Sequence, residues 1–125
     1  PNGKILVLYM AWLPFEDTIA GMSEKLVLKY NPNWTGGGEQ VRPIFIPEGY
    51  NDKFELAAHE EYKLNVPFTQ ESWNGRMKAC RGIGASLSES ETALWEAEHK
   101  KMLENNAPDE FDVIHYGAYA ELRKK

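Results

Sequence analysis

The longest apolar run in the chain begins almost at its first residue. Ile5–Leu13 holds nine apolar residues without in/out alternation, a pattern typical of a strand covered on both faces. Such strands lie inside sheets and have a neighbour along each edge. Because this one follows the opening turn directly, we expect the 125 residues to be part of a longer protein. The run is about half the length that a membrane-spanning helix needs.

Helical spacing follows the first strand. Apolar residues recur at intervals of three and four from Phe15 to Tyr30, which predicts an amphipathic helix that ends at Asn31-Pro32. We interpret the glycine run 36–38 as a flexible linker. The segment Pro43–Pro47 has a proline at each end, which indicates an edge segment or a packed loop rather than a central strand.

The period changes to two from Phe54 to Val66, where apolar and polar residues alternate. This alternation predicts a half-buried antiparallel strand. Glu60 breaks the pattern because it is a carboxylate on the apolar face. It is either paired, functional, or turned by a bulge in the strand.

Two helices and a strand complete the chain. Thr69 can cap a helix that runs to about Cys80, and Ser88 with Glu91 forms a capping box. The second helix would bury Leu94, Trp95, Met102 and Leu103 and end before Pro108, and a long last strand covers 111–122. Three strands make a thin sheet that the helices must cover.

Composition narrows the possible functions. The chain has the length of one domain, a net charge of −5 and a single cysteine, Cys80. These values argue against nucleic acid as a partner, and against a disulfide framework or a multi-cysteine zinc site. They fit a cytoplasmic protein. His59, His99 and His115 lack metal-ligand spacing, so we expect no metal and mainly structural histidines.

The segment Val66–Leu87 is locally basic in an acidic chain, and it contains Trp73, Arg76 and Arg81. Arginine can hold a carboxylate through two hydrogen bonds, and tryptophan offers a flat apolar wall. One interpretation is therefore a helix that faces a substrate. The other is an arginine that caps carbonyl groups or pairs with an acid such as Glu60.

Three segments carry a resemblance to class I S-adenosylmethionine-dependent methyltransferases. Pro1-Asn2-Gly3-Lys4-Ile5-Leu6-Val7-Leu8 resembles the turn and fifth strand of that family. The string Ser72-Trp73-x-Gly75-Arg76-Met77-x-Ala79-Cys80-Arg81-Gly82-Ile83-Gly84-Ala85-Ser86-Leu87, with Pro67-Phe68-Thr69 before it, is similar to the helix after the sixth strand in a bacterial subgroup. Phe111-Asp112-Val113-Ile114-His115-Tyr116 resembles the start of the antiparallel last strand.

The resemblance implies that residues 1–125 are one domain, the C-terminal portion of a methyltransferase. The implied fold class is α/β, part of a Rossmann-like fold. It holds a small three-stranded mixed sheet in the order first, last, middle strand, with the last strand antiparallel to both neighbours and helices packed on it. The family's glycine-rich cofactor loop and its acidic residue would lie upstream. S-adenosylmethionine is therefore expected in the full-length parent but not bound to this segment, which we expect to be inactive alone.

The resemblance also implies that this part supplies the substrate side of the enzyme. The expected ligand is a small-molecule methyl acceptor of unknown identity. The residues expected to bind it are Met10, Trp12, Glu60, Trp73, Arg76 and Arg81, with Glu60 or His59 as a possible general base. We expect self-association through the open edge of the first strand. The alternatives are a free-standing α+β small-molecule-binding module and an interaction or scaffolding domain.

Overall fold

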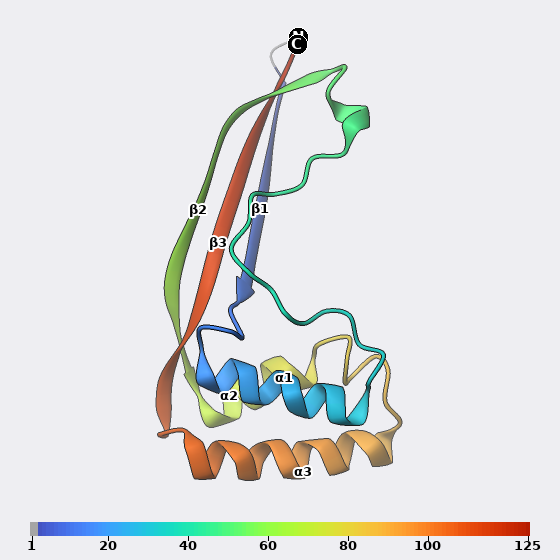
Figure 1. Ribbon diagram of the computed structural model, residues 1–125, viewed down its shortest axis with the longest axis vertical. Helices are drawn as coiled ribbons and strands as arrows, with labels where there is room; N and C mark the ends of the chain where they lie inside the picture. Colours follow the sequence, from blue (N-terminus) through green and yellow to red (C-terminus); the bar gives the residue numbers. More distant parts are fainter. Residues whose placement is uncertain (1–2) are drawn as a thin grey trace. The chain divides into compact units, whose positions relative to one another are not determined.

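The computed structural model describes residues 3–125 as one three-stranded sheet with helices packed on it (Figure 1). The elements, in chain order, are β1 (Lys4–Trp12), α1 (Thr18–Tyr30), the short 3₁₀ turn η1 (Glu48–Tyr50), β2 (Phe54–Thr69), α2 (Gln70–Lys78), α3 (Glu89–Asn106) and β3 (Glu110–Lys124). The strands pair in the order β1-β3-β2, so the predicted order is confirmed. The expectation of a mixed sheet is wrong for the described residues, because β3 lies between β1 and β2 and pairs antiparallel with both. Membership of a larger Rossmann-like sheet stays a prediction.

Backbone hydrogen bonds fix the register of β1 against β3. Leu13 N donates to Ile114 O over 2.9 Å, and Lys124 N donates to Gly3 O over 2.9 Å. Between these bonds each strand advances by ten residues. The pairing is therefore antiparallel and keeps one register from end to end.

The register of β2 against β3 changes by one residue. Gln70 N bonds Asp109 O and Lys125 N bonds Lys53 O, so β2 advances by 17 residues while β3 advances by 16. The partly buried positions of β2 also lose their period of two between Ala58 and Leu64. Both observations indicate a bulge near Glu60, which is the third of the explanations considered for that carboxylate.

Contacts group the chain into two units. The first comprises β1 up to Ala11 together with Val41–Leu64 and His115–Lys125. The second comprises Trp12–Gln40 and Asn65–Ile114, and it contains all three helices. The apolar core lies in the second unit, where α3 packs against both α1 and α2 (Figure 1). Its buried members are Trp12, Ala20, Val27, Trp73, Met77, Ile83, Trp95, Leu103 and Val113.

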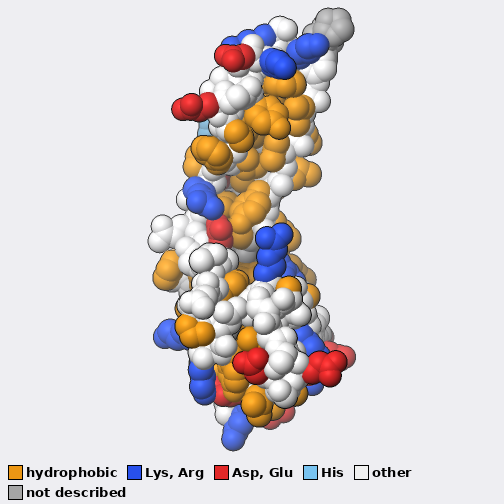
Figure 2. Space-filling model, turned by 90° about the vertical axis from the view of Figure 1, so that its right-hand side faces the viewer, with side chains coloured by type: hydrophobic (Ala, Val, Ile, Leu, Met, Phe, Trp, Pro, Cys, Tyr) orange, Lys and Arg blue, Asp and Glu red, His pale blue; other side chains and the backbone are white. Residues whose placement is uncertain are grey.

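The expectation that β1 is covered on both faces is wrong for the described residues. Leu6, Leu8 and Met10 share one face of the strand, and their exposed fractions are 61%, 71% and 56%. Figure 2 shows hydrophobic side chains gathered on the surface of the first unit. The physical reason is the lack of a covering layer, because α1, α2 and α3 all belong to the second unit whereas β1 up to Ala11 belongs to the first.

The helix limits follow the predicted caps. Thr69 and Ser88 both form capping boxes, with Ser72 and Glu91 respectively. The expected burial of Leu94 is wrong, since this side chain is 62% exposed. The buried residues of α3 are Trp95, His99 and Leu103, which share one face of the helix. Leu94 lies about 100° around the helix axis from Trp95 and points away from that face. No helix within residues 3–125 is long and apolar enough to cross a membrane.

Candidate functional site

Trp12 ends β1 and is the centre of the candidate site. Its side chain is buried, and its indole Nε1 donates a 2.6 Å hydrogen bond to Glu24 Oε2. The ring meets Trp73 edge-on, with 5.5 Å between the ring centres. The guanidinium carbon of Arg76 lies 4.8 Å from the centre of the Trp12 ring, a cation–π distance. Trp12 therefore touches a carboxylate and a cation at once.

Glu24 is a buried acid on α1. Its relative exposure is 7%, and each carboxylate oxygen accepts one N–H. Oε2 accepts from Trp12, and Oε1 accepts from the backbone N of Gly38 over 2.8 Å. No ion pair to Glu24 is formed within residues 3–125. Two neutral donors thus stabilise a carboxylate that has capacity for further hydrogen bonds.

The glycine run 36–38 packs closely against Glu24 and Trp34, so it is not the flexible linker that its composition indicated. A Cβ on Gly37 would lie 2.6 Å from Glu24 Oε1 and 2.8 Å from the Trp34 ring. Gly38 has a φ of +76°, a conformation that favours glycine. The missing side chains let the backbone approach Glu24 and donate to it, so these glycines shape the site.

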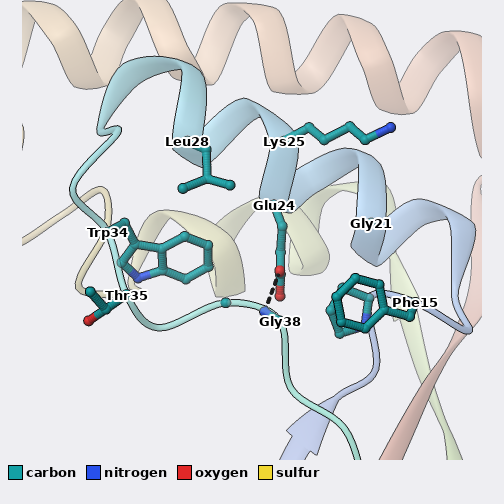
Figure 3. Close-up of a pocket in the computed structure, with 10 residues that line it drawn as sticks. Phe15, Gly21, Glu24, Lys25, Leu28, Trp34, Thr35 and Gly38 are labelled. Carbon is teal, nitrogen blue, oxygen red and sulfur yellow. Dashed lines mark hydrogen bonds between the residues drawn. The ribbon is translucent and has the colours of Figure 1, made fainter.

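A hollow of about 450 Å³ opens beside Glu24. It lies between α1, the turn after β1 and the loop that carries Trp34, and its lining is mainly apolar. Figure 3 shows the Glu24 carboxylate between the rings of Trp34 and Phe15, while the Lys25 ammonium points away from it. The lining residues are Pro14, Phe15, Gly21, Glu24, Lys25, Leu28, Trp34, Thr35, Gly37 and Gly38.

A buried polar chain links the three helices next to this hollow. Trp73 Nε1 donates to Ser23 Oγ, and Ser23 Oγ is 2.9 Å from His99 Nε2. His99 Nδ1 lies 2.9 Å from Asn74 Oδ1, and Asn74 Nδ2 donates to Glu96 over 2.8 Å. Asn74 Oδ1 can only accept, so the hydrogen of the neutral His99 ring is on Nδ1, and the serine hydroxyl donates to Nε2.

This Ser23–His99–Asn74 arrangement has the residue types of a nucleophile with its base, but it is structural. Ser23 and His99 are fully buried and Asn74 is 5% exposed, so no substrate reaches the serine. Burial lowers the pKa of His99 to about 4, against a smaller raising effect from Glu96. The histidine is therefore neutral at pH 7 and serves as a hydrogen-bonded link between α1, α2 and α3.

The structure brings together three of the residues that the sequence suggested for the site. Trp12 contacts both Arg76 and Trp73, and Trp73 is fully buried and so supports the site from the core. Arg81 is exposed after the end of α2. The alternative interpretation, an arginine that pairs with an acid such as Glu60, stays a prediction.

The sequence also suggested Met10, Glu60 and His59 for the site. Met10 and Glu60 belong to the first unit, where both are exposed. His59 Nδ1 lies 2.8 Å from Glu61 Oε2, so that histidine already has a carboxylate partner. Burial raises the pKa of the Cys80 thiol, which keeps it protonated and a poor nucleophile. No metal-binding cluster is found among residues 3–125.

Comparison with models of protein families found no match, and searches of curated proteins and of solved structures found none either. The functional argument therefore rests on the fold and on the geometry around Trp12 and Glu24.

Proposed function

We propose that this chain forms the substrate-binding side of an S-adenosylmethionine-dependent methyltransferase and supplies the last three strands of its sheet. The observation that carries the proposal is the strand order β1-β3-β2, with β3 inserted antiparallel between the other two. This is the order that the resemblance to class I methyltransferases implies. Such an order is not the simplest one, because neighbours in sequence usually also pair in sequence order.

The place of Trp12 supports the same proposal. In open α/β sheets, ligands bind beyond the carboxyl ends of the parallel strands, and in the proposed parent sheet β1 would be one of these strands. Trp12 ends β1, and Glu24 and Arg76 contact its two sides. Methyl transfer depends mainly on alignment and exclusion of water, which a partly buried aromatic cluster can provide. Such a site does not need a nucleophile of its own.

The cofactor-binding part is proposed to come from sequence outside residues 1–125. Cofactor loops of this type join a strand to a helix through glycines, so that free N–H groups face the ligand. In the described residues, the side chains of Asp17, Thr69 and Ser88 cap the three helices. The glycine loop 36–38 follows a helix instead of a strand.

The test uses the whole polypeptide that contains this chain. We expect it to convert S-adenosylmethionine to its demethylated product in the presence of an acceptor. Trp12→Ala should raise the KM for the acceptor at least about tenfold, since losing a buried aromatic contact costs more than 1.4 kcal/mol, while the KM for S-adenosylmethionine stays unchanged. Leu94→Ala, an exposed site on α3, is the control. Failure of the whole polypeptide to bind S-adenosylmethionine would contradict the proposal.

A free-standing small-molecule-binding module is the second candidate. The observation that favours it is the hollow beside Glu24, which is complete within the second unit. If ligand binding persists while S-adenosylmethionine neither binds nor reacts, this second function is the correct one.

A further inference from the structure

We propose that the hollow beside Glu24 binds a planar organic amine, with the ammonium group on the Glu24 carboxylate and the flat body against Trp34 and Phe15. The proposal names a ligand class for the substrate side of the molecule. The role of that ligand as a methyl acceptor rests on the proposed function. The binding of the amine in the hollow does not depend on the proposed function.

The first step of the argument is the charge of Glu24. A carboxylate that is 93% buried is normally paired with a cation or fully hydrogen-bonded. Here it accepts only two neutral N–H groups, from Trp12 and Gly38. About two of its roughly four acceptor positions are therefore open. A cationic donor in the hollow would complete the set.

The second step is the shape of the walls. A Cβ on Gly37 would touch both Glu24 and the Trp34 ring, so these two side chains border the same space. A Cβ on Gly38 would lie 3.9 Å from Phe15. Figure 3 shows the aromatic rings on either side of the carboxylate. Aromatic walls favour a flat apolar body, and their faces also attract a cation.

The third step is that neither Lys25 nor Arg76 forms an ion pair with Glu24 within residues 3–125. Lys25 follows Glu24 in α1, but its ammonium points away from the carboxylate (Figure 3). The guanidinium of Arg76 lies over the Trp12 ring instead. A volume of about 450 Å³ is within the range of small-molecule pockets. The site thus suits a small external cation.

The experiment titrates the ¹⁵N-labelled chain with three ligands that share one ring system and differ in charge: tryptamine, indole and indole-3-acetate. The indole N–H of Trp12 and the amide of Gly38 both donate to Glu24, so their NMR signals report on the carboxylate directly. We expect saturable shifts of both signals with tryptamine and about tenfold weaker binding of indole, as a charge-assisted hydrogen bond is lost. Indole-3-acetate should bind more weakly still.

Glu24→Gln should abolish the preference for tryptamine over indole. The matched control is Glu104→Gln, which removes the same charge from an exposed position on α3 and should leave the preference intact. Because Glu24→Gln could fail to fold, the ligand series on the unchanged chain decides by itself. Equal binding of the three ligands, or shifts that bypass Trp12 and Gly38, would overturn the proposal.

The outcomes also separate this proposal from the proposed function. If the chain binds amines selectively but the whole polypeptide transfers no methyl group, the amine site stands and the proposed methyltransferase function is refuted. If the whole polypeptide transfers a methyl group but the chain shows no preference for amines at Glu24, the proposed function stands and the amine site is refuted.

Discussion

Two buried tryptophans differ in one hydrogen bond, and this difference can be measured. Trp73 and Trp95 are both fully buried, but Trp73 Nε1 donates to Ser23 whereas Trp95 Nε1 has no partner within residues 3–125. Replacing either by phenylalanine removes a similar volume. We expect Trp73→Phe to lower the free energy of unfolding by about 1 kcal/mol more than Trp95→Phe, because only Trp73 loses a hydrogen bond. Urea denaturation tests this, and an equal or larger loss for Trp95→Phe would contradict it.

His99 should make the stability of the protein depend on pH. Its pKa is about 4 when folded and near 6.5 when unfolded, so the unfolded chain binds more protons between these values. Stability is fully present above pH 6.5 and falls as the pH drops towards 4, by up to about 3 kcal/mol. Urea denaturation from pH 7 to pH 5 should show this slope, and His99→Gln should remove it. A His99 ring signal that titrates near pH 6.5 in the folded protein would refute the assignment.

The sequence could not reveal the residues that matter most at this scale. Ser23, Glu24 and Asn74 are polar residues in helices, where composition alone predicts a solvated face. They are buried because their partners arrive from other helices, as His99 does from α3. Trp12 and Arg76 could be suggested, since aromatic and arginine side chains at the end of a strand and on a helix suit ligand binding. Only the fold brings them into contact.

At the scale of elements, local sequence signals predicted where the helices begin, whereas the burial of each element depends on its tertiary contacts. The capping residues Thr69 and Ser88 start α2 and α3 because their hydroxyls accept backbone N–H groups within the same segment. The apolar run of β1 correctly predicted a strand. It could not predict exposure, which depends on whether another layer packs on the face of that strand.

The position of β1 at one edge of the sheet leads to a prediction about association. Lys4 is the only charged residue of β1, whereas β2, on the other edge of the sheet, carries several charges and Pro67. Charges and proline protect edges against pairing, so we expect β1 to pair with a second copy. Leu8→Lys should shift the chain towards monomer in analytical ultracentrifugation and change monomer stability by no more than about 0.5 kcal/mol. Leu56→Lys, an exposed leucine of β2, is the control. A wild-type chain that stays monomeric at high concentration would count against this pairing.

At the scale of the whole molecule, the strand order is what connects the fold to a function. The alternation of strands and helices predicted an α/β sheet, but many orders of three strands satisfy it. The order β1-β3-β2 was expected only because of the resemblance. The burial pattern of β2, together with the one-residue change of its register against β3, indicates the bulge near Glu60 that the sequence left open. The predicted order is confirmed, whereas the assignment to a methyltransferase stays a prediction.

The same argument predicts what the chain should fail to do. Residues 3–125 contain no glycine-rich turn from a strand into a helix, and side chains already cap the three helix N-termini. We therefore expect calorimetric titration of this chain with S-adenosylmethionine to show no binding tighter than about 1 mM, whereas the whole polypeptide binds the cofactor. The amine series provides a positive control on the same sample, because a response at Trp12 shows that the second unit is folded. Micromolar binding of S-adenosylmethionine by residues 1–125 alone would mean that the cofactor site lies inside this chain, and the proposed division between cofactor side and substrate side would fall.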